Sequence, residues 1–387
     1  MLFEPSKHEA LNCESWSEDT VREAINSIFE DTLSHYCPEK YWPTAADEDS
    51  DVDINKTVYY GAAGTILALD KISKYLSIDL PFDSSLVMEK VHKDYLETPD
   101  TEEVVPSIFL GEVGILLVLH KLNPTLELED RIFNLVESNI ENETLEALWG
   151  APGTMIAASF LYEKTNEERW ANLFQRNSSF LIKKLKEEEA KGELIWEQNM
   201  YGKLRRWVGA GHGYFGNIFG ILKSIDLLPK GDRDYILEHV KKVIEVVKIE
   251  DNNMMNFATL NPSNPEIKQF TQWCHGAPGV ITSLHNYPSD KYVDQCLVKS
   301  GELVWKAGPL KKGIALCHGT DGNGYAFLQL YKRTGDSKWL ERGRAFAMHA
   351  LNQRNGRFTL FTGELGLALY LIDCMQGTDD FPLLDSL

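Results

Sequence analysis

Short turns of the form Gly-x-x-Gly, each followed by an apolar run, recur seven times along this chain of 387 residues. The turns are Gly61–Gly64, Gly111–Gly114, Gly150–Gly153, Gly213–Gly216, Gly276–Gly279, Gly319–Gly322 and Gly363–Gly366. Their first glycines are separated by 50, 39, 63, 63, 43 and 44 residues. The runs that follow, for example residues 115–122 and 155–161, are apolar on nearly every side and too long for edge strands. They are therefore predicted to be buried helices.

Amphipathic, charge-rich segments lie between these apolar runs. They span residues 84–95, 129–140, 166–187, 233–248, 290–305 and 336–352. Buried and amphipathic helices that alternate at such a period indicate a helical array. A glycine at the start of a buried helix also allows close approach to its neighbour, because it has no Cβ. We expect an all-α protein, a double-layered α/α barrel of seven inner and seven outer helices, with the turns at one end.

The repeats run from residue 61 to residue 366 without a linker rich in Pro, Ser or Gly, which predicts one barrel domain over residues 57–387. Residues 1–56 precede the first repeat, contain the acidic stretch Asp47–Asp53, and are expected to form a cap or arm. The hydrophobic content of 43% is enough for a large core.

Composition excludes several classes of protein. A net charge of −19 disfavours nucleic acid and anionic membranes as the main partner. No run reaches the ~18–20 apolar residues of a membrane span, and the polar, acidic start of the chain does not resemble a signal peptide. Six scattered cysteines suggest free thiols in a reducing compartment, so we expect a cytoplasmic protein.

Two of the seven turns carry a cysteine followed by histidine. They read Trp273-Cys274-His275-Gly276 and Cys317-His318-Gly319. Cys274, Cys317 and His318 form a Cys₂His set that leaves a fourth coordination position open, as in catalytic zinc sites, and predict one zinc ion per chain. A buried cysteine is often only a small hydrophobe, which is our interpretation of Cys296 and Cys374. The shared repeat position argues against that interpretation for Cys274 and Cys317.

Two further histidines leave alternatives open. His275 can line the pocket and contact substrate, or it can be a fourth ligand that closes a structural zinc site. His212 directly precedes the turn at Gly213, so it can face the metal as an acid or base, or be a hydrogen-bonded structural histidine. Residues 211–216 also match the GxGxxG pattern of dinucleotide-binding proteins, but no βαβ pattern surrounds them.

The seven turns, together with the WCHG, CHG and Gly211-His212-Gly213 motifs, resemble the LanC-like family. This family comprises the lanthionine synthetase C-like proteins and the bacterial lantibiotic cyclases. The resemblance covers residues 57–375. The sequences of residues 273–280 and 317–331 are more similar to the eukaryotic-type, glutathione-binding members than to dedicated cyclases.

The resemblance implies an α/α toroid with zinc held by Cys274, Cys317 and His318, and an acid/base role for His212. In the eukaryotic-type members it also implies that zinc activates glutathione for addition to dehydroalanine or dehydrobutyrine residues of proteins. The family places a lysine five residues before the CHG cysteine, which Lys312 matches. It places an arginine shortly before the seventh turn, which Arg354 or Arg357 matches.

The chain also departs from the family pattern. The cyclases have an arginine where this chain has Phe270, and an aspartate near the third turn, where Trp149–Pro152 offers none. The glutathione-type members have a basic residue near the N-terminus, but Met1–Pro5 contains none and Lys7 is a poor substitute.

The same residues suggest a chemistry without reference to any family. Two thiolates and an imidazole leave zinc able to bind a third thiol, which loses its proton on coordination. Addition of that thiol to a dehydroamino acid requires a proton at Cα, and His212 is the natural donor. The cations Lys312, Arg354, Arg357 and those of residues 203–206 can hold the carboxylates of glutathione.

Three functions follow from these observations. The first is a zinc-dependent transferase that forms a thioether by adding glutathione, or a similar thiol, to dehydroamino acids of a protein or peptide. The second is a lanthionine-forming peptide cyclase. The third is a non-enzymatic adaptor that binds zinc and glutathione.

Overall fold

The computed structural model describes the chain except for residues 1, 13, 46–47, 49–51, 201 and 263–268. In the described part, fourteen α-helices alternate between a buried and an amphipathic type. The even-numbered helices are α2 (Ala62–Leu76), α4 (Glu112–Leu122), α6 (Ala151–Thr165), α8 (Tyr214–Leu222), α10 (Ala277–Leu284), α12 (Thr320–Thr334) and α14 (Glu364–Gln376). They correspond to the seven apolar runs and are buried along most of their length, which confirms that prediction.

The odd-numbered helices are amphipathic. They are α1 (Glu18–Ser34), α3 (Ser84–Glu97), α5 (Leu126–Ser138), α7 (Glu168–Ala190), α9 (Lys230–Val247), α11 (Lys291–Ala307) and α13 (Ser337–Ala350). Six of them match the predicted amphipathic segments, and α1 is an additional helix within residues 1–56. Its Val21, Ile25 and Phe29 are buried, at the spacing of one helix face.

The glycine turns explain how the buried helices begin. The first glycine of each turn is the residue directly before its helix, as at Gly61, Gly213 and Gly319. The first N–H groups of a helix lack a partner within the helix. Here the chain folds back so that the first N–H donates to the carbonyl oxygen seven residues earlier. The pairs are Ala62 to Asn55, Glu112 to Val105, Tyr214 to Trp207, Thr320 to Gly313 and Glu364 to Arg357.

The second glycine of a turn makes this fold-back possible. A Cβ at Gly279 would lie 1.8 Å from the carbonyl oxygen of Trp273 and 2.8 Å from Cβ of Ala210. No side chain can occupy that space, so glycine is required where the helix passes this closely over its own preceding loop.

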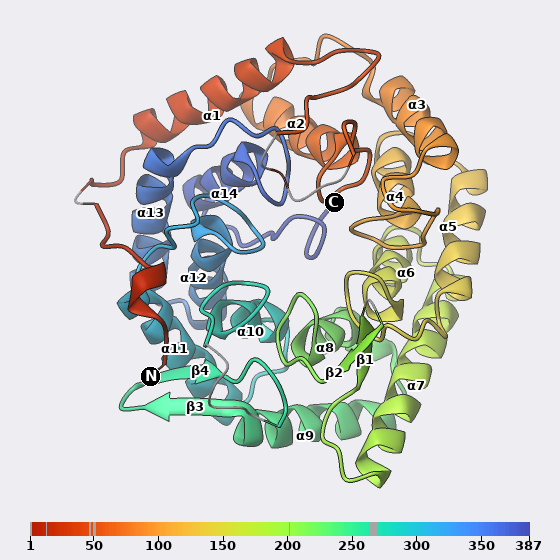
Figure 1. Cartoon of the computed structure of the whole chain (residues 1–387), viewed down its shortest axis with the longest axis vertical. Helices are drawn as coiled ribbons and strands as arrows, with labels where there is room; N and C mark the ends of the chain where they lie inside the picture. The colour runs from red at the N-terminus through yellow and green to blue at the C-terminus, as the bar shows by residue number, and fades with distance from the viewer. Residues whose placement is uncertain (1, 13, 46–47, 49–51, 201, 263–268) are drawn as a thin grey trace. The chain divides into compact units, whose positions relative to one another are not determined.

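Contacts divide the chain into two compact units, Met1–His8 with Arg131–Gly308, and Glu9–Asp130 with Pro309–Leu387. In the first unit, α8 contacts both α6 and α10 (Figure 1). Outside them, α7 covers α6 and α11 covers α10, while α9 contacts α7. Two antiparallel hairpins belong to this unit, β1 (Gln198–Met200) with β2 (Lys203–Arg205), and β3 (Lys248–Asp251) with β4 (Met254–Phe257).

In the second unit, α14 contacts α12 and α2, and α2 contacts α4. The amphipathic helices α13, α1 and α3 pack on these buried helices. The 3₁₀ turns are η1 (Pro5–Lys7) and η2 (Ile225–Leu227) in the first unit and η3 (Leu351–Gln353) in the second.

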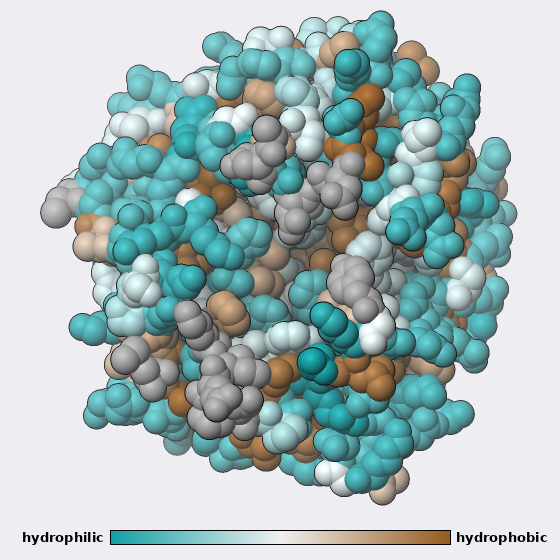
Figure 2. Space-filling model, viewed as in Figure 1, coloured by the Kyte–Doolittle hydropathy of each residue, from teal (hydrophilic) through white to brown (hydrophobic). Residues whose placement is uncertain are grey.

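Figure 2 shows hydrophilic residues over most of the visible face, with hydrophobic residues in small separate patches. Among the described residues, no helix combines the length and the apolar character that a membrane crossing requires.

Candidate functional site

The two cysteines of the Cys-His turns occupy the same place in their repeats, two residues before the glycine that precedes the helix. Backbone hydrogen bonds connect neighbouring repeats at this place within each unit. In the first unit, the N–H of Gly211 donates to the carbonyl oxygen of Cys274 at 3.1 Å. In the second, the N–H of Cys317 donates to Phe361 and that of Phe361 to Tyr59, each at 3.4 Å. Within each unit, residues at this place are therefore neighbours from one repeat to the next.

The side chain of Cys274 lies in a tight turn of the first unit and is 7% exposed. Gln272 and His275 exchange two backbone hydrogen bonds of 3.1 Å across this turn. The side-chain amide of Gln272 donates to Sγ of Cys274 at 2.9 Å. A Cβ at Gly211 would lie 2.8 Å from Cβ of Cys274, so the Gly211–Gly213 loop packs directly against the cysteine.

The start of α10, just after Cys274, differs from the other helix starts. The N–H of Ala277 donates to Oδ1 of Asn256 at 2.9 Å, and Nδ2 of Asn256 donates to the carbonyl oxygen of Phe270 at 3.0 Å. Phe270 is the residue seven positions before Ala277, so the Asn256 side chain is inserted where the five repeats named above have a direct backbone bond. Gly276, with φ of +113°, takes a conformation that favours glycine.

Asn256 is fully buried on β4 and is connected to the start of the chain as well. Its Nδ2 donates to the carbonyl oxygen of Leu2 at 2.6 Å. Its Oδ1 also accepts from the N–H of Phe257 at 2.9 Å. One amide side chain therefore fixes the turn that carries Cys274, the strand below it and the N-terminal segment.

His212 is bonded to a carboxylate. Its Nδ1 lies 3.0 Å from Oε2 of Glu146, whose side chain is completely buried, while the His212 side chain is 27% exposed. The carboxylate is fixed because it also accepts from the backbone N–H groups of Leu148 at 3.1 Å and Trp149 at 2.6 Å. Burial acts to lower the pKa of His212. The hydrogen bond and charge of Glu146, together with the charge of Cys274, outweigh burial and raise that pKa above its ordinary value.

Sequence reasoning missed Glu146. At the third turn itself, Trp149–Pro152 contains no acidic residue. Glu146 lies four residues before the turn at Gly150, in the otherwise apolar stretch Leu145–Trp149. A single carboxylate in an apolar segment that precedes a glycine turn was the signal that could have identified it.

His275 is surrounded by rings. The ring of Trp207 lies 5.1 Å from it, that of Phe270 5.9 Å and that of His212 6.2 Å, between centroids. Burial, and then the charge of His212, lowers the pKa of His275 to about 3, so its ring is neutral. Its Nδ1 is buried and has no hydrogen-bond partner in the described part of the chain. The structure thus places His275 in an aromatic wall beside His212.

The second unit holds the other two predicted ligands and the predicted cations. Cys317 is 8% exposed and His318 is half-buried, directly before α12. Lys312 is exposed, five residues before Cys317.

The two arginines are already engaged. Arg354 binds Glu364 through Nε at 2.8 Å and a terminal nitrogen at 2.6 Å, and Arg357 lies 3.6 Å from a carboxylate oxygen of Glu48. Glu364, in the first turn of α14, also accepts from the N–H of Gly356 at 2.8 Å. Arg354 therefore supports the loop before α14.

The residues present fit a zinc ion by their chemistry. Among the described residues, neither Cys274 nor Cys317 forms a disulfide, and each lies at the repeat place where loops of its own unit are hydrogen-bonded to each other. Cys274 belongs to the first unit, and Cys317 with His318 to the second. Within the described residues, no three His, Cys, Asp or Glu side chains are gathered as a metal site.

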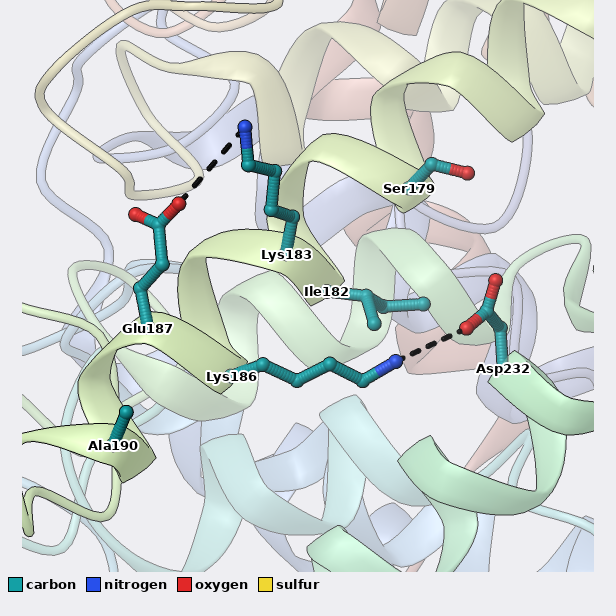
Figure 3. Close-up of a pocket in the computed structure, with 7 residues that line it drawn as sticks. All are labelled: Ser179, Ile182, Lys183, Lys186, Glu187, Ala190 and Asp232. Atoms are coloured by element: carbon teal, nitrogen blue, oxygen red, sulfur yellow. Dashed lines mark hydrogen bonds and ion pairs between the residues drawn. The ribbon is translucent and has the colours of Figure 1, made fainter.

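A groove on the outside of the first unit contains none of the predicted site residues. It lies along α7 and has a volume of about 490 Å³ (Figure 3). The ion pair of Lys186 with Asp232 at 3.4 Å joins α7 to α9 across it, and Lys183 pairs with Glu187 at 4.0 Å along α7. Its charged groups are thus paired with each other.

Comparison with known proteins gives relatives in both sequence and structure. Over 290 residues, covering 69% of this chain and 70% of the relative, the chain is 30% identical to the glutathione S-transferase LANCL1 of Danio rerio. It is 41% identical over 90 residues to the LanC-like protein GCL1 of Arabidopsis thaliana, covering 22% of this chain and 20% of that protein.

A solved structure of a nisin cyclase matches with a TM-score of 0.66 at 16% identity, covering 95% of this chain and 98% of the cyclase. This likeness shows the fold, and it confirms the predicted all-α barrel. The family model for lanthionine synthetase C-like proteins matches residues 52–385. The chain therefore belongs to the lanthionine synthetase C-like protein family.

Proposed function

We propose that this protein is an enzyme that adds the thiol of glutathione to dehydroalanine or dehydrobutyrine residues of proteins or peptides and so forms a thioether. The observation that carries the proposal is the Glu146–His212 pair, packed in one unit with the loop of Cys274. A histidine held by a buried carboxylate is suited to proton transfer. The name of the Danio rerio relative, a glutathione S-transferase, supports glutathione as the thiol.

The proposed metal ligands are Cys274, Cys317 and His318, with one zinc ion per chain. Zinc held by this donor set would lower the pKa of an incoming thiol, so that the thiol is present as the thiolate. The repeat pattern supports the set, because Cys274 and Cys317 hold equivalent places in consecutive repeats. Gln272 donates a hydrogen bond to Sγ of Cys274, which is the usual role of a group that orients a metal ligand.

The remaining chemistry falls to His212. The thiol loses its proton, its sulfur bonds to Cβ of the dehydroamino acid, and the electrons of the double bond move to Cα and the adjacent carbonyl. A proton must then reach Cα. With Nδ1 of His212 bonded to Glu146, Nε2 is the nitrogen left to donate that proton. The raised pKa of His212 favours the protonated imidazole, which is the form that donates a proton.

Lys312 is the cation best placed to bind glutathione. It is exposed and close in sequence to Cys317, whereas Arg354 and Arg357 are paired with Glu364 and Glu48. We propose that Lys312 contacts a carboxylate of glutathione and that His275 lines the pocket. Arg357 can contribute only after it separates from Glu48.

A thioether-forming peptide cyclase is the second candidate. The absence of an acidic residue in Trp149–Pro152 argued against it, but Glu146 provides a carboxylate just before the third turn, bonded to His212. Addition by a cysteine of the same peptide uses the same protonation at Cα. The two functions differ in the source of the thiol.

The test is to incubate the zinc-loaded protein with a dehydroalanine peptide, with and without glutathione, and to measure the product masses. A product heavier by one glutathione supports the transferase. A thioether ring formed from a cysteine of the peptide supports the cyclase. His212→Asn should abolish product, while Cys296→Ala, a buried cysteine away from the site, should not. Binding of zinc and glutathione without any product would favour the adaptor function. A glutathione-dependent reaction is also consistent with the proposed cytoplasmic location.

A further inference from the structure

The β1–β2 hairpin presents two cations and an apolar side chain to solvent. Lys203 and Arg205 are exposed, and Leu204 between them is 55% exposed. Successive residues of a strand point to opposite faces, so the two cations share one face and Leu204 occupies the other. The hairpin thus presents two positive charges on one face and an apolar side chain on the other.

The base of this hairpin is firmly fixed. The next residue, Arg206, binds three carboxylates, those of Glu188 at 2.6 Å, Glu197 at 2.8 Å and Glu193 at 3.4 Å. The strand register pairs Gln198 with Arg205 across the hairpin. Arg206 is therefore engaged in ion pairs within the fold. Of the cations in residues 203–206 that were predicted to bind substrate, Lys203 and Arg205 are the two that remain candidates.

The hairpin leads directly into the candidate site. Trp207 follows Arg206. Its backbone N–H donates to Oε1 of Gln198 at 2.8 Å, and this bond holds Trp207 in place. The ring of Trp207 packs against His275, and its carbonyl oxygen accepts from the first N–H of α8, two residues after His212. Leu204 is three residues before Trp207, and three extended residues span at most about 11 Å. A bound peptide of a few residues can therefore reach from the hairpin to the site.

The charge of the hairpin is the opposite of that of the protein. The net charge of the chain is −19, yet neither Lys203 nor Arg205 has a carboxylate partner among the described residues. By contrast, the cations of the groove along α7 are paired with Glu187 and Asp232. Two such cations on one face of the hairpin complement an acidic polypeptide segment.

We propose that the face of the β1–β2 hairpin that carries Lys203 and Arg205 is the docking site for the polypeptide substrate, and that it selects polypeptides with acidic residues near the dehydroamino acid. The proposal rests on the proposed function, because it assigns the recognition of the second substrate to that site. It separates two tasks, since glutathione is assigned to the loop at Lys312 and the polypeptide to the hairpin at Lys203 and Arg205.

Binding is tested first, without chemistry. A fluorescent peptide carries alanine in place of the dehydroamino acid and has either acidic or basic flanks. The wild-type protein should bind the acidic peptide more tightly, and added salt should weaken that binding. Lys203→Glu/Arg205→Glu should weaken it by about three- to tenfold or more and favour the basic peptide. Leu204→Ser, on the opposite face of the hairpin, should leave binding of both peptides unchanged. Lys164→Glu, an exposed cation in the last turn of α6, should leave binding unchanged.

Activity is tested second. With a dehydroalanine peptide that has acidic flanks, the charge-reversed variant should raise KM and leave kcat nearly unchanged. With a small dehydroalanine amide that lacks flanks, both constants should match those of the wild type.

Equal binding of acidic and basic peptides by wild type and variant would overturn the proposal. So would binding lost equally in Lys164→Glu, which would show a general charge effect. Because the binding assay involves no reaction, an inactive protein that still prefers acidic peptides would contradict the proposed function and not the docking site. A milder Lys203→Ala/Arg205→Ala variant, checked by its melting temperature, covers the case in which charge reversal unfolds the hairpin.

Discussion

Nδ1 of His212 lies 3.0 Å from Oε2 of Glu146, across 66 residues of sequence. The carboxylate is buried, and two backbone N–H groups fix it from the other side. This pair therefore sets the orientation of the imidazole and favours its protonated form.

Replacing Glu146 with glutamine should keep the side-chain volume and remove the charge. We expect the rate of thiol addition to fall about 10²-fold, with zinc content unchanged, because His212 loses the group that holds its proton. Single-turnover rates and metal analysis on the same sample check this. Glu129→Gln is the matched control, since Glu129 forms a buried pair with His120 at 3.2 Å in the other unit. Equal losses in both variants would show that only stability changed.

Zinc binding should require Cys274 and Cys317 but not His212. Cys274→Ala/Cys317→Ala should bring the metal content close to zero, because one histidine alone does not retain zinc. His212→Asn should retain one zinc per chain. The double variant Cys296→Ala/Cys374→Ala removes two other buried cysteines and serves as the control. Full zinc occupancy without Cys274 and Cys317 would refute the proposed ligand set.

Lys312→Ala should raise KM for glutathione more than it lowers kcat. A charged hydrogen bond to a substrate carboxylate contributes about 1.5–3 kcal/mol, roughly a tenfold or larger change in KM. The adjacent Lys311 is also exposed, and Lys311→Ala should leave KM unchanged. Arg354→Ala should instead lower the melting temperature, since its partner Glu364 supports the loop before α14. If Lys311→Ala and Lys312→Ala behave alike, neither lysine recognises glutathione.

Asn256→Ala should destabilise the protein by about 2–4 kcal/mol, because buried groups of the Cys274 turn lose their partners. Asn256→Asp keeps an acceptor for the N–H of Ala277 but loses both donated bonds, so it should also be destabilised. Chemical denaturation gives the free energy of unfolding, and chelator competition gives the zinc affinity, which should fall in parallel. A change below about 0.5 kcal/mol in Asn256→Ala would mean that a direct bond between Ala277 and Phe270 replaces the side chain.

Asp321→Asn should change how stability depends on pH. Asp321, in the first turn of α12, is fully buried, and both its carboxylate oxygens lack a hydrogen-bond partner in the described part of the chain. Burial, and then the charge of Glu364, raises the pKa of Asp321 well above its ordinary value. In the unfolded chain the same group ionises near pH ~4.

The stabilising contribution of protonated Asp321 is therefore complete below pH ~4 and decreases as pH rises toward the folded-state pKa. The loss is about 1.4 kcal/mol for each pH unit in that window. Relative to wild type, Asp321→Asn should gain stability progressively from pH 5 to pH 7. Free energies of unfolding measured at several pH values check this, and parallel curves for the two proteins would contradict it.

The sequence by itself determined the helices and the places of the metal-binding candidates. Seven apolar runs behind Gly-x-x-Gly turns predict buried helices because a helix that is apolar all round has no solvent-facing side. The same periodicity placed Cys274 and Cys317 at equivalent positions, since a repeat carries positional information along the chain. The helix α1 was not predicted, because it has no glycine turn of its own and lies before the first repeat.

Only the tertiary structure decided which side chains meet. Glu146 and His212 are far apart in sequence, and no local pattern connects them. Asn256 acts on the Cys274 turn from a separate strand, in the place of a bond that five other repeats make through the backbone. Arg354 looked like a substrate cation by its position, but its partner Glu364 was visible only in the folded chain. Local periodicity follows from burial and hydrogen bonding within an element, whereas the partner of a polar side chain depends on how distant elements pack.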